Sequence, residues 1–494
     1  MTYRFKFLRI SLNLIFGDNM LIKEKFAWKE FIGRIMVIAI PVALQNLLTT
    51  TGSMVDTMMI AALGENSVAA VGLCAQYATL IFSCYWGFVG GGMLFFSQYW
   101  GAGDEKGICR TYGTTLTFMM AVAAIVTTLA AFRPDFIMRV YTDKPAIQEI
   151  GVEYLKAVFP AYPFQIFSMA MSAMLRTTDR VKIPLIGSIV SVFSNILLNW
   201  LLIGGNLGFP ALGVKGAAVA TASAAVINSL TIIVICIIKK YPFLFRFREH
   251  FDWSGTWVRE YLKKSFPIIC NELFIGIGFM VINMVLGRQP EEAIAALAVF
   301  RTLEGLVIAF FSGFSNAASI LVGNCVGSGE IRTAYERAKR LVFLCGSVIA
   351  VVCIGIFVLH SPILRIMHLS GESFRICTQM IGVYSVAAVI RMCNWTQNDT
   401  YRSAGDTKFG TILEIAFQYG MVLPCIILAG QVFHLPTVIV FAAAYIDEPI
   451  RLVLMQIHMY SGKWIRPVTP EGRQALPGFM EEKRKQKVKE ETNE

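Results

Sequence analysis

The chain has 494 residues, of which 55% are hydrophobic and only 16% are charged, and its formal net charge is +11. With so few charges to solvate its surface, a chain of this length is excluded from the soluble classes, and the composition indicates a membrane protein that crosses the bilayer many times. The basic excess needs no nucleic acid as partner, because Lys and Arg beside a membrane face anionic lipid.

Twelve apolar runs are long enough to cross the roughly 30 Å of hydrocarbon in a bilayer. They lie near residues 31–62, 68–99, 113–132, 155–175, 183–203, 216–238, 264–287, 294–325, 341–360, 376–401, 409–430 and 437–458. Backbone groups inside a bilayer must be satisfied within the segment, so each run is predicted to be an α-helix. We therefore expect an all-α integral membrane protein with twelve transmembrane helices.

Lys and Arg concentrate in the connections that follow even-numbered spans and in both tails. This bias places both termini in the cytoplasm, and we expect the protein in the plasma (inner) membrane. The expected organisation is an N-terminal tail (1–30), a first lobe of spans 1–6 (31–240), a linker (241–263), a second lobe of spans 7–12 (264–460) and a C-terminal tail (461–494). Translation starting at Met20 is an alternative, because the first span owes nothing to the residues before it.

The two predicted lobes repeat one another at a constant spacing of 226 residues. Pro41 pairs with Pro267, Arg176 pairs with Arg402, and the GAGD at 101–104 pairs with the GSGE at 327–330. An even number of spans per half makes the repeat parallel, which is a common plan of secondary transporters.

The sequence lacks the motifs that several other functional classes require. No GxxxxGK[ST] loop occurs, which argues against direct use of ATP, and the five histidines form no HExxH or other clustered ligand set. The eleven cysteines contain no CxxC and are expected to be small buried hydrophobic residues. We expect no enzyme and no cofactor beyond a coupling ion.

Asp56 is the leading candidate for a functional residue, because an ionisable group inside a span costs about 2.5–3.5 kcal/mol and is usually functional or paired. Helical steps back from it reach Ser53, Thr49 and Gln45, which form a polar stripe on span 1 and a candidate cavity wall. The alternative is an inter-helix hydrogen bond that only holds the bundle together.

Span 5 carries Asn195 and Asn199, which lie four residues apart and share one face. Their amide oxygens can complete a cation site, and Thr221 in span 6 is a weaker candidate; structural hydrogen bonding is the alternative for the pair. The second lobe has further polar candidates in its spans: Glu272, Arg301, Glu304, Arg391, Asp399, Asp447, Glu448 and Arg451. Arg391 needs an acidic neighbour, and Asp399 lies three residues before Arg402, so a local pair is the plain interpretation there.

The sequence resembles the multidrug and toxic compound extrusion (MATE) family from about residue 33 to the SGKWIRPVT at 461–469. The matching stretches are PVALQNLLTTTGSMVDTMMIAALG, SQYWGAGD, LRTTDRVKIPLIGSIVSVFSNILLNWLLIGGNLGFPALGVKGAAVAT, FPIICNEL and YRSAGDTKFG. The resemblance implies two six-helix lobes that form a V and export organic cations in exchange for Na⁺ or H⁺.

Residue by residue, Asp56 matches the family's span-1 acid and Pro41 its span-1 proline, a candidate hinge. Asn195 and Asn199 fall on its span-5 polar pair, whose second position is often Asp. Glu272 matches the span-7 glutamate of one branch, but this chain has Arg391 where that branch has an acid. The resemblance thus implies cation coupling, with Na⁺ as an option, at Asp56, and a second-lobe ion site that does not carry over intact.

The hypothesis from the sequence is antiport: Asp56 takes up a proton or Na⁺, and a cationic substrate competes for carboxylates such as Glu272. Glu304, Arg391 and Asp399 complete the second lobe's polar set. We expect a monomer whose partners are small organic molecules and membrane lipid. A lipid-linked glycan flippase of related architecture is the nearest rival, and a membrane-embedded enzyme is a remote one.

Overall fold

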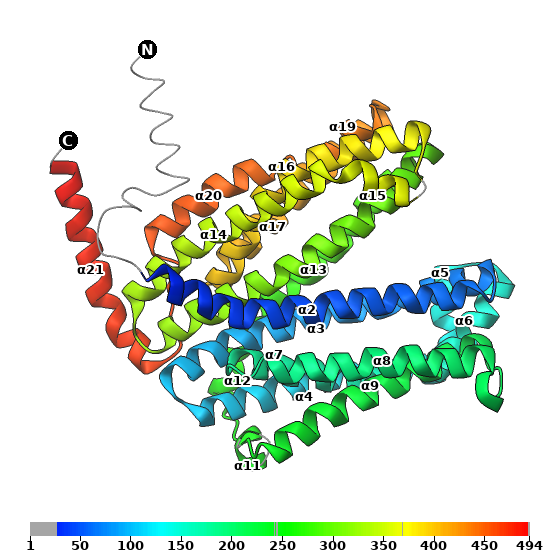
Figure 1. Ribbon diagram of the computed structural model, residues 1–494. Helices are drawn as coiled ribbons and strands as arrows, with labels where there is room; N and C mark the ends of the chain where they lie inside the picture. The colour runs from blue at the N-terminus through cyan, green and yellow to red at the C-terminus, as the bar shows by residue number, and fades with distance from the viewer. Residues whose placement is uncertain (1–26, 242, 244–245, 368, 493–494) are drawn as a thin grey trace. The chain divides into compact units, whose positions relative to one another are not determined.

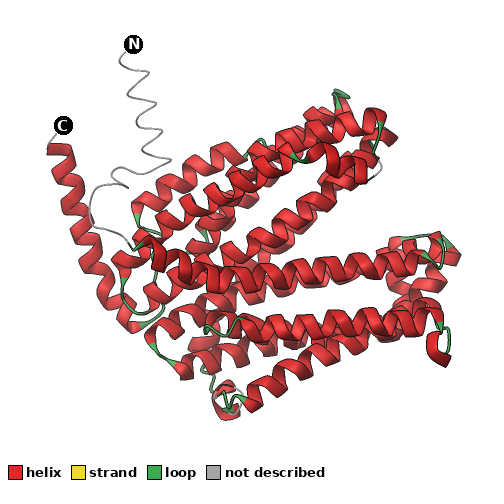
Figure 2. Ribbon diagram, in the orientation of Figure 1, coloured by secondary structure: helices red, strands yellow, loops and turns green. Residues whose placement is uncertain are grey.

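The computed structural model describes residues 27–241, 243, 246–367 and 369–492. These residues are almost entirely helical, and their strand-like pairing is limited to one isolated bridge between Gly405 and Ile465 (Figure 2). The expected all-α membrane class is confirmed. Most of the predicted N-terminal tail and the alternative start at Met20 lie outside the described residues.

The helices follow the predicted spans closely (Figure 1). Those of the first half are α2 (Trp28–Ala61), α3 (Glu65–Ala102), α4 (Glu105–Phe132), α5 (Pro134–Tyr141), α6 (Pro145–Val158), α7 (Ala161–Thr177), α8 (Lys182–Gly204) and α9 (Gly213–Ile238). After the short α11 (Phe247–His250), the second half has α12 (Gly255–Leu286), α13 (Glu291–Gly327), α14 (Ile331–Val358), α15 (His360–Ile366), α16 (Gly371–Ser403), α17 (Phe409–Phe417), α18 (Leu423–Ile427), α19 (Thr437–Ala443), α20 (Glu448–Ser461) and α21 (Pro470–Thr492). Two π-helical segments, Gln418–Val422 and Leu428–Val432, continue α17 and α18 through the eleventh predicted span.

Within the described residues, ten helices are long and apolar enough to cross a membrane. The pair α6 and α7, which is bent by 55° at its break, is also long and apolar enough when its two helices are counted as one span. The twelfth predicted run is divided between α19 and α20, of 7 and 14 residues. The break lies beside Asp447 and Pro449, and α20 begins with the charged Glu448 and Arg451. Neither helix alone is therefore long and apolar enough to count as a membrane span, although the two together occupy the predicted run.

The chain divides into two compact units. The first, here the N-terminal unit, contains Pro41–Phe96 and Asp104–Leu273; the second, the C-terminal unit, contains Met1–Ile40, Ser97–Gly103 and Phe274–Glu494. In the N-terminal unit α9 packs against α6, α7 and α8; in the C-terminal unit α13, α14 and α16 pack against one another and α20 packs on α16. The predicted lobe boundaries stay a prediction.

The backbone repeats with the spacing found in the sequence. Gly103 and Gly329 both adopt positive φ, at 72° and 83°, in the turns after α3 and α13. Asp179 and Gly405 do the same after α7 and α16, at 61° and 100°. Asp is one of the few L-residues that tolerate this conformation, which explains how a residue with a side chain stands where its counterpart is glycine.

Repeat-related segments also pack against each other inside the C-terminal unit. A Cβ added to Gly101 would collide with the carbonyl of Asn324, and one added to Gly327 would collide with the carbonyl of Gln98. Gly101 pairs with Gly327 in the repeat, and Gln98 pairs with Asn324, so the two contacts are equivalent. A self-complementary contact of this kind is what two-fold symmetry produces.

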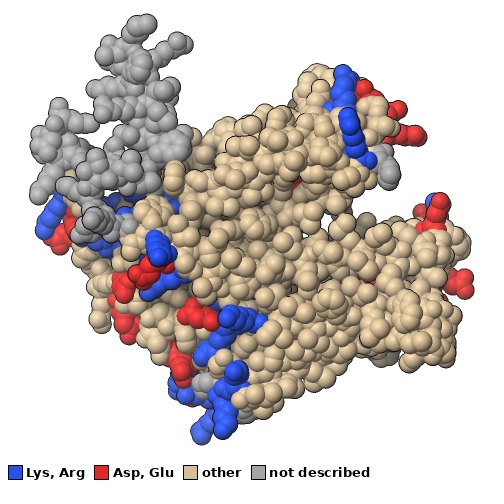
Figure 3. Space-filling model, viewed as in Figure 1, with Lys and Arg blue, Asp and Glu red and all other residues tan. Residues whose placement is uncertain are grey.

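The segment after α20 is well packed, although the sequence suggested only a tail. The backbone N–H of Arg466 donates to the carbonyl of Ala404 at 2.8 Å, and that of Val468 donates to Oε1 of Gln98 at 2.7 Å. The Thr469 hydroxyl donates to the carbonyl of Gly327 at 2.8 Å. Charged side chains gather near the helix ends on the face that Figure 3 shows, as juxtamembrane charges should.

Candidate ion site in the N-terminal unit

Asp56 lies half-buried on α2 and is bound directly by α8. Nδ2 of Asn199 donates to Oδ1 of Asp56 at 2.5 Å. A hydrogen bond to an ionised carboxylate is about twice as strong as one between neutral groups, so this contact holds the carboxylate in one orientation.

Asn195 lies one helical turn before Asn199, and the two side chains are in contact. Nδ2 of Asn199 also donates to Oδ1 of Asn195, at 3.2 Å. Asn199 is fully buried, and its own Oδ1 has no hydrogen-bond partner among the described residues. One carboxylate oxygen of Asp56 and the amide oxygen of Asn195 therefore both accept from the same amide group, and oxygens of these kinds are chemically able to accept a small cation or a proton.

Thr221 belongs to the same neighbourhood through a residue that the sequence did not indicate. Tyr154 on α6 is buried and lies close to both Thr221 on α9 and the Asp56 carboxylate. Tyr154 was missed because it immediately precedes the apolar run that predicted span 4. A hydroxyl beside the carboxylate adds a further polar group to the site.

The other residues of the predicted polar stripe, Gln45, Thr49 and Ser53, have different surroundings. Gln45 is buried, donates to the hydroxyl of Ser188 at 2.9 Å and accepts from Nη2 of Arg176 at 2.7 Å. Thr49 and Ser53 are exposed, and their hydroxyls donate to carbonyls of their own helix. Gln45 thus binds a buried arginine of another helix. The hydroxyls of Thr49 and Ser53 instead donate to backbone carbonyls of α2 itself.

Pro41 lies inside α2, fifteen residues before Asp56, where it removes a helical hydrogen bond and permits a bend. The repeat-related Pro267 lies inside α12 in the same way. Glu272 follows Pro267 on α12 and is half-buried.

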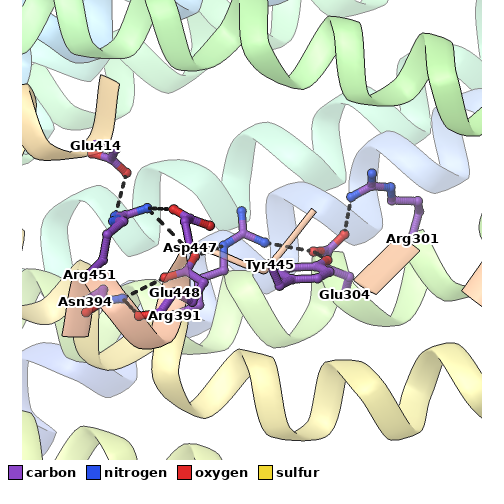
Figure 4. Close-up of polar contacts among 9 residues, drawn as sticks. All are labelled: Arg301, Glu304, Arg391, Asn394, Glu414, Tyr445, Asp447, Glu448 and Arg451. Atoms are coloured by element: carbon purple, nitrogen blue, oxygen red, sulfur yellow. Dashed lines mark hydrogen bonds and ion pairs between the residues drawn. The ribbon is translucent and has the colours of Figure 1, made fainter. Parts of the chain in front are cut away.

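The remaining sequence candidates lie in the C-terminal unit. Arg391 has the acidic neighbour that it needs: Nη1 lies 3.2 Å from Oε1 of Glu304, and Nε lies 3.9 Å from Oε1 of Glu448 (Figure 4). Asp399 is separate from this group. It pairs with Arg402 at 3.8 Å and accepts a hydrogen bond from the Ser315 hydroxyl.

Glu414 is a further charged residue inside a predicted span, and it is not among the candidates named from the sequence. It is buried on α17, where Oε1 accepts from Arg451 at 3.3 Å and Oε2 accepts from Asn398 at 3.0 Å. The sequence does contain a signal for polar partners in this region. Arg391, Asn394 and Asn398 recur at helical spacing and form a polar stripe on α16, and Asn398 is a partner of Glu414.

Among the described residues, no group of three or more His, Cys, Asp and Glu side chains is arranged to hold a metal ion. Asp56 with the amide oxygens of Asn195 and Asn199 is therefore a site with one carboxylate. A single carboxylate suits a proton or a monovalent cation better than a divalent one, whose all-protein sites carry more charge.

The comparisons with known proteins agree with this architecture. The MatE family model matches residues 41–201 and again 267–426, which are the two halves of the repeat. The chain is 24% identical over 415 residues to "Uncharacterized transporter YisQ" of Bacillus subtilis, covering 83% of this chain and 90% of the relative. It is also 24% identical over 451 residues to "Probable multidrug resistance protein NorM" of Thermotoga maritima, covering 90% and 95%.

Solved structures of the same fold are similar over nearly the whole chain. One is described as a crystal structure of MATE in complex with MaL6, with a TM-score of 0.78 at 19% identity, covering 92% of this chain and 99% of that one. Another is an outward-facing multidrug resistance MATE family transporter, with a TM-score of 0.76 at 18% identity, covering 87% and 96%. With the family model matching both halves of a polytopic helical chain, the protein belongs to the MATE family of membrane transporters.

Proposed function

We propose that the protein is a secondary active multidrug exporter, which moves organic and often cationic compounds out of the cell in exchange for Na⁺ or H⁺. The observation that carries this proposal is the contact between Asp56 and Asn199, which joins two helices through an ionisable group. Relatives described as probable multidrug resistance proteins support the substrate class.

Uptake of a proton or Na⁺ neutralises Asp56 and weakens its attraction for the amide of Asn199. The contact between α2 and α8 then changes, and Pro41 supplies a bend in α2 through which that change can move the helix. Release of the cation to the cytoplasm restores the ionised carboxylate. In this cycle both termini are cytoplasmic, the membrane is the plasma membrane, and the protein acts as a monomer.

The test is export of a fluorescent organic cation from proteoliposomes under a Na⁺ gradient or a pH gradient, each imposed separately. Wild type should export under at least one gradient, and the effective gradient identifies the coupling ion. Asp56→Asn should abolish gradient-driven export while the protein still reconstitutes.

Asp143→Asn is the matched control, because it makes the same chemical change at an exposed residue between α5 and α6. It should export like wild type. Undiminished export by Asp56→Asn would overturn the proposed role of this carboxylate. Loss of cell-envelope glycan on deletion, without a change in drug sensitivity, would favour the glycan flippase instead.

A further inference from the structure

A cluster of charged side chains is buried inside the C-terminal unit, and the proposed export cycle makes no use of it (Figure 4). Its members come from α13, α16, α17 and α20 and from Asp447 immediately before α20, and they are referred to here as the arginine–carboxylate cluster. They are Arg301, Glu304, Arg391, Glu414, Asp447, Glu448 and Arg451. All except Arg301 are buried.

Three of the four carboxylates have an arginine nitrogen close by. Glu304 is 2.5 Å from Arg301 and 3.2 Å from Arg391, and it also accepts from the Tyr445 hydroxyl at 3.3 Å. On the other side of the cluster, Arg451 is shared by two acids. It lies 3.1 Å from Asp447 and 3.3 Å from Glu414.

Glu448 is the exception. Its Oε1 is 3.9 Å from Arg391 and 3.9 Å from Arg451, beyond hydrogen-bond reach of both guanidinium groups. Its Oε2 accepts from the neutral amide of Asn394 at 2.7 Å. Among the described residues, Glu448 is thus the one carboxylate of the cluster that accepts no hydrogen bond from a guanidinium group.

The cluster also carries one negative charge too many, because three guanidinium groups face four carboxylates. The neighbouring Asp399 and Arg402 carry opposite charges, so counting them with the cluster leaves this balance unchanged. An uncompensated carboxylate in a membrane interior is costly, and the usual relief is to bind a proton or another cation.

Two buried amide oxygens beside the carboxylates lack a donor. Asn394 is 0% exposed and donates to Glu448, yet its Oδ1 has no hydrogen-bond partner in the structure. Asn398 is 4% exposed and donates to Glu414, and its Oδ1 is likewise unpartnered. A carboxyl group that carries a proton is a hydrogen-bond donor, whereas an ionised carboxylate can only accept.

We infer that the C-terminal unit contains a second proton-binding site, centred on Glu448 and set apart from Asp56. One exchangeable proton on Glu448 removes the surplus charge and gives this carboxyl group an O–H that can donate to the neighbouring Asn394. When this proton leaves, Glu448 attracts Arg391 and Arg451 more strongly, and Arg391 is drawn away from Glu304. Occupancy of the site is therefore linked to the packing of α13, α16 and α20.

Infrared difference spectroscopy of the purified protein in lipid can detect this proton without any transport assay. A protonated carboxyl group has its own C=O stretching band, which shifts in D₂O, and exposed Asp and Glu are ionised at neutral pH. The measurements use an Asp56→Asn background, so that the first-lobe carboxyl cannot contribute. Glu448→Gln should remove the intensity of one carboxyl group from the neutral-pH band.

Glu304→Gln provides a second, independent variant. It removes one carboxylate from the cluster and frees Arg391 to pair with Glu448, so the same band should disappear although Glu448 is intact. Glu372→Gln is the control, because Glu372 is an exposed residue at the start of α16 that pairs only locally with Arg375. It should leave the band unchanged.

Addition of Na⁺ at fixed pH distinguishes two forms of the site. A band that Na⁺ removes identifies a site that exchanges H⁺ for Na⁺, and a band that persists identifies a site for protons alone. A neutral-pH band that survives both Glu448→Gln and Glu304→Gln, in protein that melts cooperatively, would overturn the inference. Because transport is not the readout, this failure is distinct from failure of the proposed export function.

Discussion

Asn199 donates a hydrogen bond of 2.5 Å to Asp56, although the two residues are 143 positions apart on α8 and α2. The same amide group donates to Asn195 at 3.2 Å, so one side chain connects the carboxylate to a second polar residue. Asn199 is therefore the residue that orients Asp56, and Asn195 acts through it.

This arrangement predicts unequal effects at the two asparagines. Asn199→Ala removes a hydrogen bond to a charged group, which is worth about 1.5–3 kcal/mol, and should reduce gradient-driven export roughly tenfold or more. Asn195→Ala should have a smaller effect, because the hydrogen bond of Asn195 is to Asn199 and not to the carboxylate itself. Export of a fluorescent cation from proteoliposomes measures both; an equal or larger loss in Asn195→Ala would contradict the orienting role of Asn199.

Gln45 is predicted to support the fold of the N-terminal unit. Its side chain is a hydrogen-bond acceptor for the buried Arg176, so Gln45→Leu removes a hydrogen bond to a charged group, which is worth about 1.5–3 kcal/mol. Gln45→Leu should lower the melting temperature of the purified protein by several degrees. Thr49→Val, one turn along the same helix, is the control: its hydroxyl bonds only to its own backbone, and its melting temperature should stay near that of wild type.

The number and position of the helices could be read from the sequence because the bilayer imposes both length and apolarity on each span. The last span was the hardest, since Asp447, Glu448 and Arg451 interrupt its apolar pattern. Asp447 pairs locally with Arg451, but the other partners of these residues come from α16 and α17, which lie elsewhere in the chain, so no local pattern could reveal them.

The residues of the candidate ion site could also be found from the apolar pattern, whereas their partners could not. Asp56, Asn195 and Asn199 were found because a polar residue inside an apolar run is conspicuous. The stripe from Gln45 to Asp56 was read as one face, but Gln45 is committed to Arg176, a residue 131 positions away. Helical periodicity tells which residues share a face and leaves open which partner each will bind.

The contact between repeat-related segments predicts strict size limits at two glycines. Gly101→Ala would place a methyl group onto the carbonyl of Asn324, and Gly327→Ala would do the same at Gln98. Each substitution should lower the yield and melting temperature of the protein, because backbone atoms cannot move aside as a flexible side chain can. Gly33→Ala in α2 is the control, because a Cβ there has no atom within 4 Å, and it should behave like wild type. Normal stability of both Gly101→Ala and Gly327→Ala would show that this close approach is absent.

The buried position of Lys483 leads to the prediction that the C-terminal helix α21 docks more tightly at alkaline pH. Its ammonium group donates to the carbonyl of Tyr460 and lies 4.0 Å from the ring centre of Tyr335. Burial, and next the nearby charge of Lys339, lower the pKa of Lys483 from 10.5 to about 8. With α21 detached, the same amine keeps its proton up to about pH 10, so between the two pKa values the detached state binds more protons and the docked state gains stability as the pH rises.

Hydrogen exchange of the α21 amides, corrected for the intrinsic pH dependence of exchange, measures this docking directly. Protection in wild type should increase between about pH 8 and pH 10. Lys483→Met keeps the apolar stem and removes the titrating group, so its protection should already be high at pH 7 and should not change further. Lys485→Met is the matched control, because Lys485 is exposed and pairs only with Glu481 on its own helix, and it should keep the wild-type pH dependence. If protection in Lys483→Met still rose with pH, the titration would belong to another group and the role of Lys483 would have to be abandoned.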